Sequence, residues 1–257
     1  MEMRERYRPG VHCITNPVTM QGVANILLAA GGRAIMAQAP EEVEEITALC
    51  QALLLNTGVP SKEKIRSCVL AGKKANILGI PVVLDPVGAG ASRFRAEQLE
   101  ILTKKVRFSI IRCNQEEAKA LLHIWEGRSG GVESGADVEE QEQLALAERL
   151  ALDYGCTAFV SGKRDAVSDG KESRILEGGS RRLARLTGGG CMLSALCSLM
   201  CGLGMTPYEA ALTAGRLWRE SAALAERQTE AVGAGIGTFQ TKLFDAVEEL
   251  FYRGEKE

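Results

Sequence analysis

The sequence has few histidines, nearly balanced charges and no long apolar segment. The chain has two histidines, His12 and His123, which gives little support to a Ser-His-Asp triad or a histidine metal cluster. A formal net charge of −2 gives no sign of binding to nucleic acid or to a membrane surface. No uncharged apolar run reaches the ~18–20 residues that a membrane-spanning helix needs. We therefore expect no nucleic-acid and no membrane partner.

The eight cysteines lack the spacing of a redox or zinc motif. The sequence has no C-x-x-C, and Cys197 and Cys201 stand four residues apart without histidine partners. Residues 1–6 are mostly charged and contain no apolar core of a secretory signal peptide. Cysteines in such a chain are typically reduced thiols that pack as small hydrophobic residues. We expect a cytoplasmic protein.

Short, continuously apolar segments predict the strands of a parallel sheet that is covered on both faces. Longer helical patterns separate these segments, and the alternation predicts a doubly wound α/β fold. A chain of 257 residues can form such a fold as one domain, residues 1–257. The expected strands are residues 34–37, 52–56, 80–84, 108–111 and 157–160.

Capping signals predict where several helices begin and end. Pro40 precedes a run of acidic residues, as at a helix start, and Ser61 can cap a helix that Gly79 closes. Thr206-Pro207-Tyr208-Glu209 has the pattern of a capping box. The expected helices begin near residue 40, cover 61–78 and 138–154, begin near residue 191, and run from 206 toward 227.

Two segments do not fit the alternation of strands and helices. Residues 127–137 are rich in Gly and Ser, which is typical of a flexible surface loop. Residues 171–185 carry Gly178-Gly179 among charged residues, which predicts a hairpin or a strand-loop-strand excursion.

Gly188, Gly189 and Gly190 stand directly before Cys191 and a run with almost no charge. Glycine is costly to order, so three in a row indicate a backbone geometry or a close approach that a Cβ would forbid. If a helix begins near Cys191, its free N–H groups and positive dipole end form a site for an anion such as a phosphate. An ordinary loop is the alternative interpretation.

Polar motifs follow three of the expected strands, where ligands bind in open α/β sheets. They contain Asp85, Arg112 with Glu117, and Ser161. A phosphate-transferring enzyme needs a cation for the phosphoryl oxygens, acids for Mg²⁺ and backbone donors, and these motifs with the glycine run could supply them. Separately, each has a plainer interpretation: a turn residue, a surface ion pair or a helix start. The sequence has no G-x-x-x-x-G-K-[ST] P-loop.

The ordered set of motifs resembles hydroxyethylthiazole kinase over roughly residues 11–245. Each motif alone is weak, but their matching order is quite specific. The motifs are His12-Cys13-Ile14-Thr15-Asn16, Leu54-Leu55-Asn56-Thr57-Gly58, Asp85-Pro86-Val87-Gly88-Ala89-Gly90-Ala91, Arg112-Cys113-Asn114-Gln115-Glu116-Glu117, Thr187-Gly188-Gly189-Gly190-Cys191 and Gly233-Ala234-Gly235-Ile236-Gly237-Thr238-Phe239.

This resemblance implies a ribokinase-like fold, with a mostly parallel central sheet between helices. It implies ATP- and Mg²⁺-dependent phosphorylation of the hydroxyl of 4-methyl-5-(2-hydroxyethyl)thiazole, a salvage step toward thiamine. It also implies a homotrimer with active sites between subunits. By resemblance the site residues are Asn16, Met36 and Gly188 for the thiazole; Arg112, Asn114 and Ser161 for ATP; Asp85 and Glu117 for Mg²⁺; and Cys191 with Gly188, Gly189 and Gly190 at the reacting groups.

Several positions depart from the pattern of that family. Gly189 stands where Ala or Thr is common, and Cys113 stands where Gly is usual. Ser161-Gly162-Lys163 replaces Thr-Gly-Glu, which keeps a hydroxyl and reverses a charge beside the nucleotide. Pro17 stands where a bulkier residue is common, and Thr238 stands where the family has serine. These changes bear on nucleotide affinity and on the thiazole accepted.

Cys191 and His12 are the ambiguous residues of the predicted site. A helix N-terminus lowers a thiol pKa, so Cys191 could be partly thiolate, whereas a neighbouring triphosphate opposes this. We expect Cys191 to orient the hydroxyl and assist its deprotonation modestly. His12 is as well explained by a structural hydrogen bond as by a role as base.

Two other functions remain as alternatives. Another ribokinase-like activity, such as hydroxymethylpyrimidine kinase or NAD(P)H-hydrate dehydratase, is disfavoured because those relatives usually have Asp where Cys191 stands. A non-catalytic thiazole- or nucleotide-binding protein is disfavoured because a sensor does not need both Asp85 and Glu117.

Overall fold

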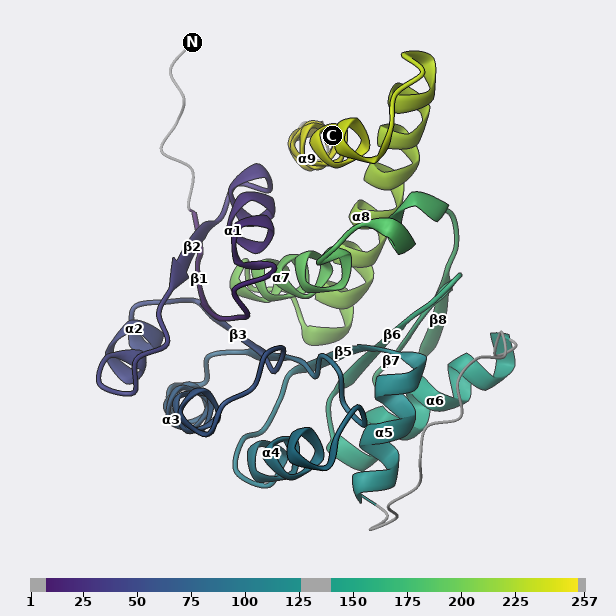
Figure 1. The fold of residues 1–257 in the computed structure, drawn as a ribbon. Coiled ribbons are helices and arrows are strands. Elements are labelled where there is room, and N and C mark those ends of the chain that lie inside the picture. Colours follow the sequence, from purple (N-terminus) through teal and green to yellow (C-terminus); the bar gives the residue numbers. More distant parts are fainter. Residues whose placement is uncertain (1–7, 126–139, 254–257) are drawn as a thin grey trace.

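The computed structural model describes residues 8–125 and 140–253, which form one eight-stranded sheet between two layers of helices (Figure 1). The strand order is β2-β1-β3-β4-β5-β6-β7-β8; pairs from β2 to β6 are parallel, and β7 and β8 are antiparallel additions. The strands are β1 (Gly10–Ile14), β2 (Arg33–Met36), β3 (Ala52–Asn56), β4 (Val82–Asp85), β5 (Ile110–Asn114), β6 (Thr157–Ser161), β7 (Asp165–Ser168) and β8 (Ser173–Leu176).

Each face of the sheet has its own buried core. Helices α1, α7, α8 and α9 cover one face and α2 to α6 cover the other, so the molecule is a three-layer sandwich (Figure 1). The helices are α1 (Met20–Ala29), α2 (Val43–Ala48), α3 (Lys62–Leu78), α4 (Arg93–Thr103), α5 (Gln115–Trp125), α6 (Glu140–Tyr154), α7 (Gly189–Gly202), α8 (Pro207–Ala231) and α9 (Ile236–Arg253).

The order of the strands determines where a ligand can bind. Within the sheet, the chain passes from β1 to β2, which is the neighbour of β1 on one side. It then passes to β3, which is the neighbour of β1 on the other side. A reversal of this kind opens a crevice at the carboxyl ends of the strands, the usual ligand site of such sheets. Asn56 ends β3, Asp85 ends β4 and Ser161 ends β6, so all three lie along this edge.

The five expected strands are all confirmed within a few residues. The observed strands β4 and β5 begin two residues later than predicted and extend to the polar residues Asp85 and Asn114. Strand β1 was not predicted from the sequence; its five residues are all buried, although one of them is His12. Strand β7 was not predicted either, because it has only two apolar residues, which lie between Asp165 and Ser168.

The capping signals were correct where a side chain caps the helix. Ser61 accepts a hydrogen bond from Lys64 N, and α3 ends at Gly79, whose φ of 69° is left-handed. Thr206 and Glu209 form the expected reciprocal capping box of α8. The start at Pro40 was wrong by three residues, since residues 40–42 form a turn before α2.

The excursion at residues 171–185 was only partly predicted. It contains a single strand, β8, whose antiparallel partner is the unpredicted β7, followed by a loop and a short 3-10 helix, η1 (Arg181–Arg185). Strands β7 and β8 extend the sheet beyond its parallel part, and the loop after β8 reaches the carboxyl edge. The expected loop at 127–137 lies outside the described residues.

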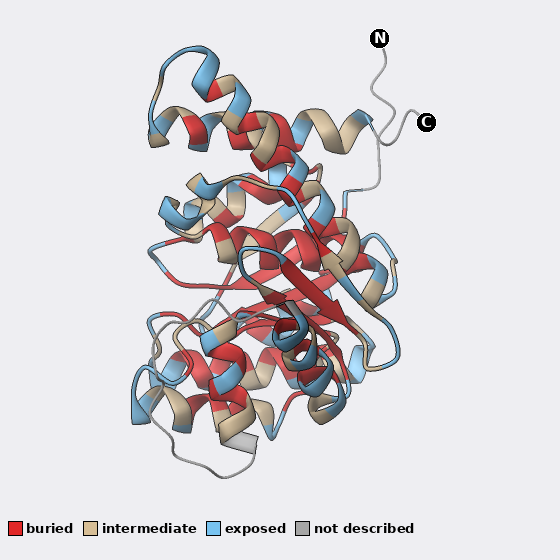
Figure 2. Ribbon diagram, turned by 90° about the vertical axis from the view of Figure 1, so that its right-hand side faces the viewer, coloured by how far each residue is buried: buried red, intermediate tan, exposed pale blue. Residues whose placement is uncertain are grey.

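Helix α7 is the most deeply buried helix of the sandwich and carries the glycine run. Every residue of α7 except Gly190 is buried, and the helix has no charged residue (Figure 2). It begins at Gly189, two residues before the expected start, because Gly188 serves as its N-cap. Across the described residues, no helix has the length and hydropathy required to cross a membrane.

Candidate active site

Two cavities open side by side at the carboxyl edge of the sheet. The larger, of about 930 Å³, lies over β5 and β6 and reaches the loop after β8. The smaller, of about 420 Å³, lies over β1, β3 and β4. Both cavities share four lining residues, namely Arg112, Asn114, Gly189 and Gly190. A group bound at this shared wall would therefore be accessible from both sides.

The glycine run has the tight geometry that its sequence predicted. Gly188 has a φ of 80°, and a Cβ there would lie 2.8 Å from the Thr19 side chain. A Cβ on Gly190 would overlap the guanidinium of Arg112. The amides of Gly190 and Cys191 occupy the first turn of α7, where a helix leaves N–H groups for an outside acceptor. The run thus brings backbone donors and a cation to one point.

Arg112 is held at the shared wall from two neighbouring strands. Its Nη2 donates to Ser161 Oγ at 2.5 Å, and its Nη1 lies 3.8 Å from Asp85 Oδ1. Its side chain is only 10 % exposed. Because these partners fix its orientation, the guanidinium is preorganised to bind an anion that enters the wall.

Asp85 lies at the centre of the smaller cavity's polar floor and is fully buried. Asn56 donates to its Oδ2 at 2.6 Å, whereas its Oδ1 has no hydrogen-bond partner. Burial raises the pKa of the Asp85 carboxyl, and the charge of Arg112 opposes part of that shift. The site therefore holds an incompletely satisfied carboxylate next to a cavity.

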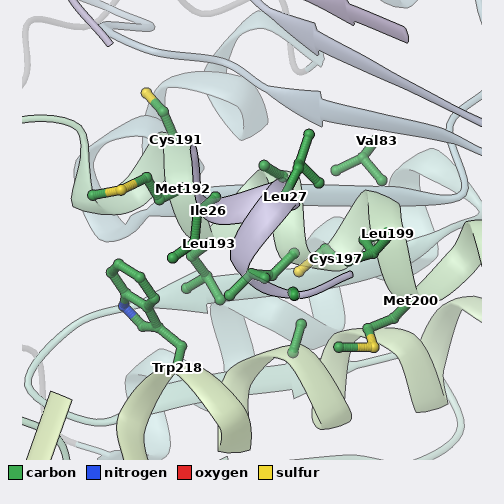
Figure 3. Close-up of a cluster of buried hydrophobic side chains, with 14 of the residues drawn as sticks. Ile26, Leu27, Val83, Cys191, Met192, Leu193, Cys197, Leu199, Met200 and Trp218 are labelled. Atoms are coloured by element: carbon green, nitrogen blue, oxygen red, sulfur yellow. The ribbon is translucent and has the colours of Figure 1, made fainter. Parts of the chain in front are cut away.

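Of the two opposing effects on the Cys191 thiol that the sequence suggested, the one that favours the neutral thiol prevails. Burial, with the nearby charge of Asp85, raises the pKa of Cys191 to about 12. The helix N-terminus does not overcome these effects. Asn56 donates to the sulfur at 3.1 Å, and the sulfur points away from Leu193 and Trp218 in the core (Figure 3). Cys191 lines the smaller cavity as a neutral polar group.

Glu117 and Asn114 cap the start of α5 reciprocally. Asn114 Oδ1 accepts from Glu117 N at 2.8 Å, and Glu117 Oε2 accepts from Asn114 N at 3.0 Å. Glu117 Oε1 accepts from Gly88 N at 2.9 Å. Burial and the charge of Asp85 raise the pKa of Glu117. The helix-start interpretation of Glu117 is thus confirmed, and Glu117 also lines the smaller cavity.

The donor set of the smaller cavity fits a magnesium ion held largely through water and phosphate. Mg²⁺ is usually bound by one or two carboxylates with substrate phosphates. Asp85 has a buried oxygen without a hydrogen-bond partner, and its charge helps to raise the pKa of Glu117, an effect that a bound cation would relieve. Among the described residues, no cluster of three His, Cys, Asp or Glu side chains could hold a metal without such help.

The remaining predicted residues lie at different distances from this centre. Asn16 joins it: its Nδ2 donates to Asn56 Oδ1 at 3.0 Å and it lines the smaller cavity. Met36 does not line either cavity; it ends β2, beside Cys13 of β1. His12 is structural, since it bonds Thr47 Oγ1 at 2.8 Å and Ala37 O at 2.9 Å.

Several residues at the site were not identified from the sequence as having a role there. Asn56 bonds both Asp85 and Cys191, and its place at a strand end was the available signal. Lys64 is buried, donates to Gly58 O at 2.6 Å, and has a pKa lowered by burial. Val59, next to Gly58, lines the smaller cavity at a φ of 49°, an unusual value for a β-branched residue. Arg219 of α8 reaches the larger cavity, and an arginine on the apolar stripe of that helix was its signal.

Comparisons with known proteins agree on one family. The profile of the hydroxyethylthiazole kinase family matches residues 1–253. Hydroxyethylthiazole kinase of Lysinibacillus sphaericus (strain C3-41) is 40 % identical over 251 residues, which cover 96 % of this chain and 94 % of that protein. The protein of the same name from Clostridium botulinum (strain Eklund 17B / Type B) is 39 % identical over 93 % of this chain and 86 % of its own length.

Solved structures give the same result for the fold. Hydroxyethylthiazole kinase from Pyrococcus horikoshii OT3 superposes with a TM-score of 0.82 at 36 % identity, covering 94 % of this chain and 88 % of that chain. Pyridoxal kinase from Staphylococcus aureus in complex with AMP-PCP gives a TM-score of 0.64 at 15 % identity, over 85 % and 89 % of the two chains, which shows the fold alone. The chain has the ribokinase-like fold and belongs to the hydroxyethylthiazole kinase family, a family of phosphotransferases.

Proposed function

We propose that this enzyme transfers the γ-phosphoryl group of ATP to the hydroxyl of 4-methyl-5-(2-hydroxyethyl)thiazole. The observation that carries the proposal is the wall common to the two cavities, with Arg112 and the glycine run at its centre. A nucleotide in the larger cavity and an alcohol in the smaller one would meet there. The site residues inferred by resemblance keep those roles within this proposal, except Met36, which lines neither cavity.

The larger cavity is suited to the polyphosphate of the nucleotide. Arg112, Lys163 and Arg181 supply positive charge, and Ser161 and Asn114 supply neutral polar groups. Arg112 and the amides at the start of α7 would contact the transferred group, where charge shifts toward the leaving ADP. Lys163 therefore adds a cation to the nucleotide side of the site.

The smaller cavity would position the acceptor hydroxyl beside Cys191. Phosphoryl transfer passes through a loose transition state, so alignment of the hydroxyl contributes more than a strong base does. Asn16 and the backbone of Gly188 line the same space as the neutral thiol. These groups would orient the alcohol, and its proton can leave late in the reaction.

Asp85 and Glu117 would hold Mg²⁺, with water and phosphate oxygens completing its coordination. A cation held by these residues would supply positive charge that offsets the charge developing during transfer. Asn56 holds the Asp85 carboxylate, and two backbone amides hold that of Glu117. Both carboxylates would therefore need little rearrangement to bind the cation.

The decisive experiment for the proposed activity is ADP release with Mg·ATP and one alcohol at a time. We expect release that depends on hydroxyethylthiazole and is absent with hydroxymethylpyrimidine, which tests the alternative kinase activity. Binding of the thiazole without any ADP release would favour a sensor instead. Thiazole-independent release would count against both interpretations.

Replacement of Cys191 by Ala should slow the reaction only modestly. A thiol with a pKa of about 12 is almost wholly protonated at neutral pH and cannot act as a strong base. We expect kcat to fall about tenfold or less, below the roughly 10²-fold minimum typical of general acid–base groups. Initial rates at saturating ATP measure this; complete inactivation of a correctly folded Cys191→Ala protein would show that the sulfur is essential.

We also propose a homotrimer in which a second subunit completes the thiazole pocket. Val18 and Val59 are 66 % and 52 % exposed although both line the smaller cavity, so one side of the cavity has an apolar, open rim. Light scattering should give three times the 27.6 kDa chain mass; a monomer with full activity would contradict this arrangement.

A cytoplasmic location fits the same proposal. All eight cysteines are buried free thiols, as is usual in a reducing compartment. Cell fractionation tests the location, and recovery in an oxidising compartment would contradict it.

A further inference from the structure

We infer that Arg219 is a positioning residue that holds the nucleotide cavity in its binding shape, by tying two loops of the cavity wall to α8. This inference rests on the proposed function, because it assigns the larger cavity to ATP. The observation that supports it does not depend on that assignment: Arg219 is buried, and its five N–H donors all form hydrogen bonds with residues of these two loops.

The contacts of Arg219 account for its whole guanidinium. Its Nε donates to Asp165 Oδ2 at 2.5 Å, and its Nη1 donates to Gly178 O at 2.5 Å and to Lys163 O at 3.3 Å. Its Nη2 donates to Gly162 O and Lys163 O, each at 3.3 Å. An arginine has five such donors, so none is left for a ligand.

The first loop held by Arg219 is the turn between β6 and β7. Asp165, which pairs with Arg219, also accepts from Gly162 N at 3.1 Å through its other oxygen. From the opposite side, Gln143 of α6 donates to Val160 O at 2.9 Å and to Arg164 O at 2.7 Å. The turn is therefore fixed from both layers of helices, and it presents Lys163 to the cavity.

The second loop joins β8 to η1 and depends more heavily on Arg219. Its residues Gly178 and Gly179 have φ values of 87° and 92°, in the left-handed region where glycine is favoured. A second side-chain tie across the two loops is the Arg164–Glu177 pair at 3.6 Å, whose side chains are 48 % and 69 % exposed. Exposed pairs contribute little. The buried bond from Arg219 to Gly178 is thus the stronger of these two ties.

Loss of this tie should affect ATP more than thiazole. Glycine-rich segments lose much conformational entropy when they become ordered. Without the bond to Arg219, the loop would have to become ordered when ATP binds, and this entropy loss would weaken the binding of ATP. The smaller cavity does not contain Arg219, Gly178 or the β6–β7 turn. A positioning role therefore predicts a change in the Kd and KM for ATP with a small change in the KM for the thiazole.

The test compares Arg219→Gln with Arg216→Gln, a matched change at an exposed arginine of the same helix. We expect Arg219→Gln to raise the Kd of ATP, measured calorimetrically without thiazole, by about tenfold, as expected for losing preorganisation in a binding loop. The KM for ATP should rise in parallel and the KM for thiazole should stay within about twofold. Arg216→Gln should behave as wild type.

A second variant covers the case in which Arg219→Gln does not fold. Arg219→Gln alone leaves Asp165 as an unpaired buried charge. Combining it with Asp165→Asn removes both charges and keeps an acceptor for Gly162 N. We expect this double variant to fold and to retain the raised Kd for ATP. A folded variant with wild-type ATP affinity would overturn the inference. If the wild-type enzyme itself neither bound ATP nor phosphorylated thiazole, the proposed function would be the part that fails.

Discussion

Replacing Asp85 with asparagine should lower kcat about 10²–10³-fold, the range typical of removing one electrostatic contact at a reacting centre. The asparagine has nearly the same shape and can still contact Asn56, so the change removes mainly the negative charge next to Arg112. Binding of Mg·ATP should weaken as well, because one of two carboxylates for the cation is lost. Rates at saturating thiazole over a magnesium titration measure both effects.

The same variant should change thermal stability little in the absence of ligands, because removing a costly buried carboxylate is opposed by leaving buried Arg112 without its ion-pair partner. Asp85 is fully buried, and its Oδ1 has no hydrogen-bond partner, so its charge is costly to the fold. The ion pair with Arg112 offsets this only in part, at 3.8 Å. A stable but inactive Asp85→Asn protein would indicate a carboxylate kept for catalysis. An unfolded protein, or one with near-normal kcat, would contradict this role.

Replacing Gly190 with alanine should also cause a large loss, about 10²-fold in kcat/KM, comparable to losing one oriented contact to the transition state. The new Cβ would overlap the Arg112 guanidinium, which Ser161 and Asp85 fix in place. The guanidinium would then have to leave those partners. Steady-state kinetics measure the loss, and a change in both KM for ATP and kcat is expected because Arg112 borders both cavities.

Gly189→Ala is the matched control for this substitution, because it keeps the backbone amide of the glycine run and adds a Cβ that does not reach Arg112. A Cβ at Gly189 would meet Leu183 O at 3.6 Å and Trp218 at 3.7 Å, both ordinary contact distances. Alanine in a helix also restricts the unfolded chain, so this variant should be as stable as wild type or more stable by about 0.4–1 kcal/mol. Equal activity losses in Gly189→Ala and Gly190→Ala would show that general crowding of the loop, and not Arg112, is responsible.

The sequence allowed prediction of features that depend on one segment at a time. Continuous apolar segments identified the parallel strands except β1, and the rule for strand ends then placed Asp85, Arg112 and Ser161 at one edge. Ser61 and Thr206 mark helix starts because their side chains accept from the local backbone. Helix α1 was missed because Thr19 makes no such bond and the helix has no charged residue.

Features that depend on distant segments could not be predicted. The ionisation of Cys191 is determined by burial and by Asp85 from another strand, which outweigh the local effect of the helix start. Arg219 and Asp165 pair across 54 residues of sequence, and nothing in either local pattern indicates the other. The overlap of Gly190 with Arg112 likewise appears only once α7 lies over β5.

The most direct test of the central claim is a phosphorus NMR time course with Mg·ATP and hydroxyethylthiazole. If Arg112 and the glycine run form the point of transfer, the γ-phosphate signal should be replaced by that of a phosphate monoester on the hydroxyethyl carbon. Formation of this ester should be strongly slowed in Gly190→Ala but not in Gly189→Ala. Conversion of ATP to inorganic phosphate without the ester, or equal ester formation in both variants, would contradict phosphoryl transfer at Arg112 and the glycine run.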